Sequence, residues 1–167
     1  MSALRTILDA STILESTGWY VRQNAAHSRG HVDLAAQRDT VRLLVTVDPT
    51  EGELEYVSPT LFRHTPAIDN AFIALAAVSD DLERFNREVL ADDLEDAAGT
   101  DITADEVHAL HARKDVLHAI VITNQTLPSD TIRLEQSNVV TAGHQWIDVV
   151  RADAFPAFAE SLTRHDR

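Results

Sequence analysis

The chain has no cysteine, and its 167 residues include a single lysine, Lys114. The absence of cysteine excludes disulfides, thiolate metal sites and a cysteine nucleophile. The five glycines are scattered singly, so there is no glycine-rich loop of the kind that cradles phosphates. No apolar run is long enough to span a bilayer, and no signal segment stands at the N-terminus. The sequence therefore predicts a soluble, cytoplasmic protein with no membrane partner.

Basic residues are scarce, with 14 Lys and Arg against 27 Asp and Glu, which gives a net charge of −13. Such a charge disfavours binding to nucleic acid unless a local basic patch compensates for it. One basic grouping stands near residues 22–42 and consists of Arg22, Arg29, Arg38 and Arg42. An acidic chain almost without lysine is typical of salt-in halophiles, so we interpret the composition as that of a halophilic archaeal protein. The codon bias of a GC-rich organism is the alternative interpretation.

A β-hairpin is the most informative stretch of the sequence. Val32–Ala36 is apolar apart from Asp33, Val41–Val47 is largely apolar, and the residues between them are polar and turn-like. This pattern predicts two short strands rather than a helix. Because side chains alternate across a strand, Asp33 is expected on one face, with Val32 and Leu34 together on the other.

Three segments around this hairpin resemble the core of the PD-(D/E)XK restriction-endonuclease-like superfamily, closest to its Mrr-like members. They are GWYV at 18–21, HVDLAA at 31–36 and LLVTVD at 43–48. The resemblance implies an α/β fold, a three-layer sandwich whose central mixed sheet is flanked by helices. In that family an acid on one strand is followed about a dozen residues later by Glu or Gln, one apolar residue and Lys. Here Asp33 matches the acid, and the partner positions hold Thr46 and Asp48.

Thr46 and Asp48 differ from the residues that the family uses for catalysis. Family members hold a divalent metal between the acids, and their Lys acts on the attacking water and the developing phosphate charge. Thr46 is a poor metal ligand, and Asp48 places a negative charge where the family has a positive one. The resemblance therefore implies a catalytically inactive, cofactor-free nuclease-like domain that binds a protein partner or nucleic acid. The alternative is a divergent endonuclease that uses magnesium or manganese held by Asp33, Asp48 and either His31 or Glu15.

Length and composition predict one domain over residues 1–167, with a mainly helical insertion at 50–115. Thr65 followed by Pro66 predicts the start of a helix, with Thr as the N-cap and Pro at the first helical position. The helical pattern then continues to about residue 98. Since one helix of that length, about 50 Å, is long for a small domain, a break is expected near Ser79 and Asp80.

The second half of this helical region contains apolar residues at helical spacing, namely Leu82, Phe85, Val89 and Leu94. They predict an amphipathic helix. One interpretation is an interface for a protein partner or a homodimer, and the other is packing of the helix on its own sheet.

The two ends of the chain complete the predicted domain. Ala3–Ser16 is expected to form a helix, and Val116–Thr123 and Trp146–Val150 are expected to form strands. A short helix is predicted over Pro128–Gln136. Asp153 is predicted to cap a final helix over residues 154–163.

Overall fold

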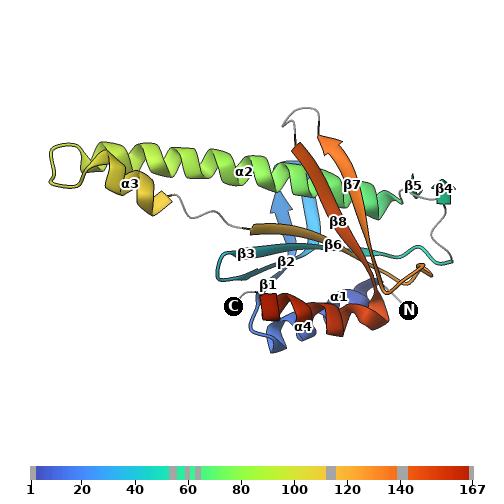
Figure 1. Ribbon diagram of the computed structural model, residues 1–167. Coiled ribbons are helices and arrows are strands. Elements are labelled where there is room, and N and C mark those ends of the chain that lie inside the picture. The colour runs from blue at the N-terminus through green and yellow to red at the C-terminus, as the bar shows by residue number, and fades with distance from the viewer. Residues whose placement is uncertain are drawn as a thin grey trace.

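The computed structural model describes residues 3–52, 56–58, 61–62, 65–111, 116–138 and 143–165. The chain folds into a six-stranded mixed sheet with helices on both faces (Figure 1). In chain order the elements are α1 (Ala3–Ser16), β1 (Tyr20–His27), β2 (Gly30–Arg38), β3 (Val41–Asp48), β4 (Tyr56–Ser58), β5 (Leu61–Phe62), α2 (Pro66–Ala97), α3 (Ala104–His111), β6 (Val116–Thr123), β7 (Thr131–Asn138), β8 (Gly143–Arg151), the 3-10 turn η1 (Ala152–Ala154) and α4 (Phe155–His165). The predicted α/β class is confirmed.

The strand order in the sheet is β1-β2-β3-β6-β8-β7. The first three strands form an antiparallel meander, β3, β6 and β8 are parallel, and β7 returns antiparallel to β8. Strand β6 is almost continuously apolar because it lies between two parallel neighbours and both of its faces are covered. The register places Asp48 beside Thr123, and Thr123 beside Arg151. Polar residues of three parallel strands therefore meet at one edge of the sheet.

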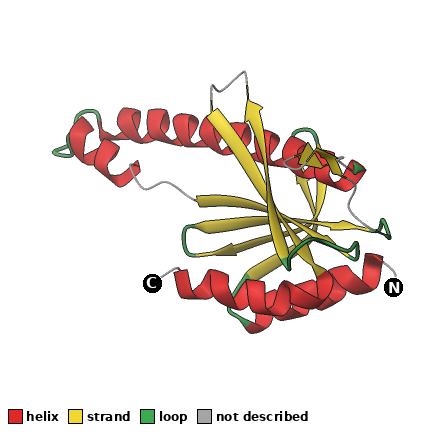
Figure 2. Ribbon diagram, turned by 45° about the vertical axis from the view of Figure 1, so that its right-hand side comes forward, coloured by secondary structure: helices red, strands yellow, loops and turns green. Residues whose placement is uncertain are grey.

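The structure has three layers, with α1 and α4 on one face of the sheet and α2 on the other (Figure 2). Fully buried Leu14 and Phe155 anchor α1 and α4 in one apolar cluster, and Ile68 and Phe72 anchor α2 in another. Burial of these side chains drives the layers together, at about 1.5–3 kcal/mol for each large apolar residue. The arrangement is consistent with a three-layer sandwich.

Helix α2 runs unbroken for 32 residues, so the expected break near Ser79 is wrong. The chain has no Pro or Gly between Pro66 and Gly99, and propensity alone does not end a helix of such residues. Asp80, which stands at the expected break, and its neighbour Asp81 bind the β1–β2 turn. The Asp81 carboxylate accepts a hydrogen bond from the Ser28 amide at 3.0 Å, and Asp80 pairs with Arg29 at 3.4 Å.

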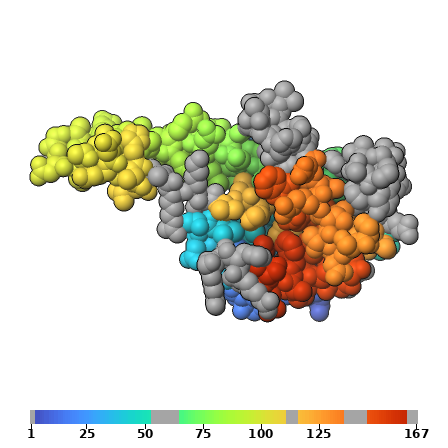
Figure 3. Space-filling view, in the orientation of Figure 1, coloured from blue at the N-terminus to red at the C-terminus, as the bar shows by residue number. Residues whose placement is uncertain are grey.

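The second half of α2 projects from the sheet together with α3 (Figures 1 and 3). We call residues 79–111 the helical hairpin. The first half of α2 buries seven residues against the sheet, whereas Glu83–Glu88 are six consecutive exposed residues. Among residues 79–110, whose exposure the structure describes, Val107 of α3 is the one buried residue. The middle of α2 is therefore bare, because the sheet ends before it and α3 packs farther along.

Two predictions near the C-terminus are wrong. Residues 131–138 form β7 rather than a helix. Ile132 and Leu134, two residues apart, both pack on the α2 face of the sheet, and the strand pairs along β8. Asp153 lies inside η1 and pairs with the guanidinium Nε of Arg151 at 3.2 Å, so it does not act as a helix cap. The first helix, the strand at β6 and the strand within β8 are confirmed.

Candidate functional site

Asp33 closes a gap between β2 and β3. The pairing of these two strands runs from the turn as far as Leu34 opposite Val45. One step beyond, the Asp33 carboxylate oxygen Oδ2 accepts a hydrogen bond from the backbone N–H of Val47 at 2.8 Å. The side chain thus takes the place of a carbonyl in the strand ladder, and it satisfies a donor that would otherwise lack a partner.

The regular alternation of side chains along β2 is interrupted at Asp33. The prediction that Val32 and Leu34 lie on the same face of the sheet is therefore wrong. Leu34 packs on the α1 and α4 face, whereas Val32 packs in the cluster on the α2 face. On β1, Asn24 stands opposite Asp33 between two paired positions and has a φ of +49°. Asn tolerates this left-handed conformation better than most residues. The distortion at Asn24 and Asp33 therefore breaks the simple alternation of side chains between the two faces of β2.

Asp48 is buried, with only 1% of its surface exposed. Its Oδ1 accepts a hydrogen bond from the Thr50 N–H at 2.9 Å, and its Oδ2 accepts one from the Thr65 hydroxyl at 2.6 Å. The Thr65 Oγ1 in turn accepts from the Ile68 N–H at 3.3 Å, which is the predicted N-cap of α2. Asp48 therefore joins the end of β3 to the start of α2.

The other predicted site residues do not gather around a common point. Thr46 is half-buried on β3, His31 is exposed on β2, and Glu15 is exposed on α1. In the described part of the chain no three His, Asp or Glu residues are placed to hold a metal ion. The metal-dependent alternative stays a prediction, and Asp48 would have to bind the ion through the lone pairs that its hydrogen bonds from Thr50 and Thr65 do not use.

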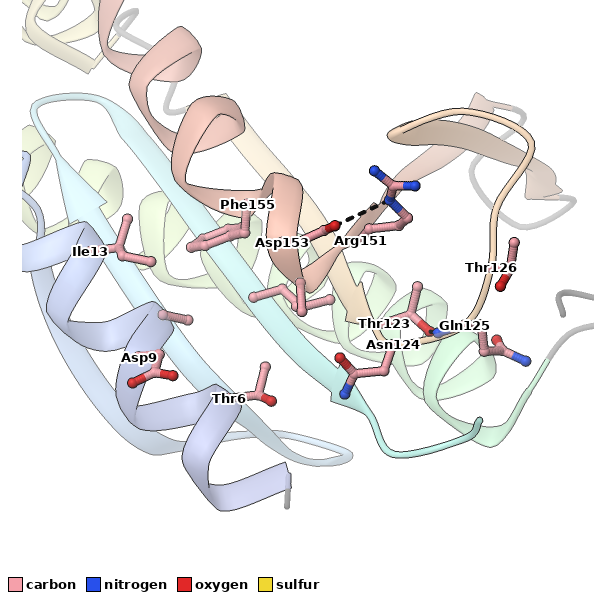
Figure 4. A pocket seen from close by; sticks show the side chains of 13 residues that line it. Thr6, Asp9, Ile13, Thr123, Asn124, Gln125, Thr126, Arg151, Asp153 and Phe155 are labelled. Atoms are coloured by element: carbon pink, nitrogen blue, oxygen red, sulfur yellow. Dashed lines mark hydrogen bonds and ion pairs between the residues drawn. The ribbon is translucent and has the colours of Figure 1, made fainter. Parts of the chain in front are cut away.

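A cleft of about 390 Å³ opens at the carboxyl ends of β6 and β8, where α1 and α4 approach the sheet (Figure 4). Ligands of open α/β sheets commonly bind at such an edge. The polar residues that line the cleft are Thr6, Asp9, Thr123, Asn124, Gln125, Thr126, Arg151 and Asp153. This cleft was not predicted from the sequence, although polar residues at and directly after the ends of the buried strands β6 and β8 signal it.

The charged groups of this cleft are already paired. The Arg151 guanidinium donates a hydrogen bond to Asp130 at 2.6 Å and forms an ion pair with Asp153 at 3.2 Å, and Asp9 pairs with Arg5 at 3.3 Å. None of the lining residues is a His, Lys or Cys. The cleft therefore offers hydrogen-bonding side chains to a small polar molecule.

A second cavity, of about 220 Å³, lies beside α2 on the sheet face of β1, β2 and β3. We call it the basic pocket, because Arg22 and Arg42 are among its lining residues and none of them is acidic. Of the basic grouping noted in the sequence, Arg29 pairs instead with Asp80. The four arginines of that grouping therefore do not form one basic surface.

The β1–β2 turn is held against α2 next to the basic pocket. Burial raises the pKa of the Asp81 carboxyl, but hydrogen bonds from Ser28 outweigh this effect, and nearby Arg84 and His27 add to them. The pKa of Asp81 consequently lies below its ordinary value. This carboxylate remains charged under ordinary conditions and fixes the turn to the helix.

The chain matches no protein-family model, and no curated protein is significantly similar to it in sequence. No helix in the described ranges is long and apolar enough to cross a membrane. Function is therefore inferred from the geometry of the sheet edge, the two cavities and the helical hairpin.

Proposed function

We propose that the protein is a noncatalytic, restriction-endonuclease-like domain that binds a positively charged protein surface through its helical hairpin. The mixed sheet with helices on both faces is consistent with the three-layer sandwich that the resemblance implies. The observation that carries the proposal is the exposure of apolar side chains on this acidic projection.

The hydrogen bonds of Asp33 and Asp48 support the noncatalytic part of the proposal. A carboxylate that serves as a metal ligand needs free lone pairs directed at the ion. Each Asp48 oxygen already accepts one hydrogen bond, from Thr50 or from Thr65, and the Asp33 oxygen Oδ2 accepts one from the Val47 amide. These carboxylates stabilise the ends of strands and the start of α2.

We expect the wild-type protein to show no cleavage of single- or double-stranded DNA or RNA that depends on magnesium or manganese. The measurement is a nuclease assay in high-potassium buffer, run beside Asp33→Ala and the control Asp153→Ala. Cleavage that disappears in Asp33→Ala but persists in Asp153→Ala would contradict the proposal, because it would place a working site on the β2–β3 hairpin. Residual cleavage common to all three proteins would be assigned to contamination.

The helical hairpin supports the binding part of the proposal. Residues 79–111 contain eleven Asp and Glu against two Arg, so this projection carries much of the net negative charge. Phe85 is 61% exposed and Leu110 is 80% exposed. Exposed large apolar residues supply affinity when a partner buries them, and the surrounding acids favour a basic partner over an acidic one.

Binding through the helical hairpin is expected to depend on Phe85. The probe is a fluorescein-labelled helical peptide with Arg and Leu on one face, and the readout is fluorescence anisotropy. Burial of a Phe side chain contributes about 1.5–3 kcal/mol, so Phe85→Ser should weaken binding at least about tenfold.

Ile73→Ser is the matched control, since Ile73 is also exposed and lies on the sheet-packed half of α2. It should leave the affinity for the peptide unchanged. Equal losses in Ile73→Ser and Phe85→Ser, or no loss in either variant, would count against the helical hairpin as the binding surface.

A further inference from the structure

The bare middle of α2 carries a short apolar seam. Val78, Leu82, Phe85 and Val89 follow one another at spacings of four, three and four residues. This is the a/d spacing of a coiled coil, and it places the four side chains along one stripe of the helix. Val78, Leu82 and Val89 are half-buried, whereas Phe85 is exposed. A seam of this kind suits a second helix laid alongside α2.

The seam begins at the basic pocket. Val78 forms part of the pocket wall, together with apolar Val32 and Leu44 of the sheet. Phe85 stands two helical turns beyond Val78 on the same face of α2, because seven residues correspond to almost two full turns. The chain thus presents an exposed aromatic side chain near the basic pocket, and Phe85 of the same chain does not line that pocket.

We propose that a second copy of the chain pairs with α2 in antiparallel orientation, so that Phe85 of each copy enters the basic pocket of the other. A two-fold axis between Asp81 and Leu82 places Phe85 of one copy opposite Val78 of its partner, since both residues are equally far from the axis along the helix. Closed dimers are built from such reciprocal contacts. This inference rests on the proposed function, and the second copy supplies the positively charged surface.

The charge of Glu88 agrees with this arrangement. Glu88 lies three residues after Phe85 and therefore on the same side of α2. When Phe85 enters the basic pocket, Glu88 approaches a lining that contains Arg22 and no acidic residue. The chain has 27 acidic residues, but none of them lines the basic pocket. An acidic helix is therefore repelled only weakly at this surface.

The register of the two α2 helices can be tested by disulfide cross-linking. Because the chain has no cysteine, a single introduced thiol can form a disulfide only with the introduced thiol of another copy. Residues beside a two-fold axis approach their own copies. Leu82→Cys is therefore expected to form at least ten times more covalent dimer under mild oxidation than Leu110→Cys. Leu110 is the control, since it is 80% exposed on α3 and lies outside the seam. A mixture of Val78→Cys and Phe85→Cys chains should likewise cross-link to each other more than either does to itself.

Sedimentation velocity gives the independent measurement. The wild type should dimerise, and Phe85→Asp and Arg22→Glu should each raise the dimer dissociation constant at least tenfold, with circular dichroism checking that both variants fold. A wild type that stays monomeric while binding the Arg-rich peptide through Phe85 would overturn the second-copy assignment and leave the proposed function standing. A dimer in which Leu82→Cys cross-links no better than Leu110→Cys would overturn the antiparallel arrangement.

Discussion

Asp48→Ala is expected to lower the free energy of unfolding by about 3 kcal/mol, because hydrogen bonds to a charged group contribute about 1.5–3 kcal/mol each. The substitution removes the acceptor of both the Thr50 amide and the Thr65 hydroxyl at a position that is 1% exposed. It also loosens the N-cap that Thr65 provides to α2. The measurement is urea denaturation followed by circular dichroism, with the slope of the transition checked for a change in denatured-state compactness.

Two further variants define the role of the Asp48 charge. Asp92→Ala removes an exposed acid from the same long helix and should change stability by less than about 0.5 kcal/mol. Asp48→Asn keeps one acceptor oxygen and should lie between Asp48→Ala and the wild type. If Asp48→Ala cost no more than Asp92→Ala, the carboxylate would not be the link between β3 and α2 that its contacts indicate.

Features set by neighbouring residues were predictable from the sequence. The helix over Ala3–Ser16 and the hairpin of β2 and β3 follow from their apolar periodicity. The start of α2 follows from Thr65 and Pro66, whose capping chemistry acts over one helical turn. In each case the pattern and the physical cause lie within a few residues of each other.

Features set by distant contacts were not predictable in the same way. Asp80 and Asp81 have the composition of a helix cap, yet their partners lie on the β1–β2 turn, about fifty residues earlier in the chain. Residues 131–138 form a strand because β8 offers an edge to pair with. The change of face at Asp33 depends on the conformation of Asn24 on the neighbouring strand.

The candidate site shows the same division. The sequence identified Asp33 and Asp48 as carboxylates of the predicted hairpin, but the donors that bind them, among them Val47 and Thr65, follow from the fold. The cleft beside Arg151 was missed because three segments far apart in the sequence build it. Residue types and their spacing can identify a carboxylate as a candidate site residue. The role of that carboxylate depends on which hydrogen-bond donors the fold places beside it.

Net charge is also an incomplete guide to what the surface can bind. The value of −13 describes the whole chain, but the helical hairpin concentrates acids while the lining of the basic pocket contains none. Two surfaces of opposite character therefore occur on one molecule. Association between copies is physically reasonable on this ground, even though the average charge of the chain opposes it.

Asp33→Ala and Asp33→Asn are expected to separate a structural carboxylate from one held in readiness for a metal. Asp33→Ala leaves the Val47 N–H without its acceptor and should cost about 2 kcal/mol of stability. Asp33→Asn retains a side-chain oxygen at that position and should cost less than about 1 kcal/mol. The measurement is urea unfolding together with hydrogen exchange of the Val47 amide, whose protection should fall in Asp33→Ala and persist in Asp33→Asn.

The opposite result is expected if Asp33 and Asp48 form a metal site. Neighbouring carboxylates that await a cation repel each other, so removal of either charge would stabilise the metal-free protein. Asp33→Ala and Asp33→Asn would then both raise the free energy of unfolding, and magnesium would stabilise the wild type but neither variant. A loss of stability confined to Asp33→Ala, with no effect of magnesium, identifies Asp33 as the acceptor that holds the ends of β2 and β3 together.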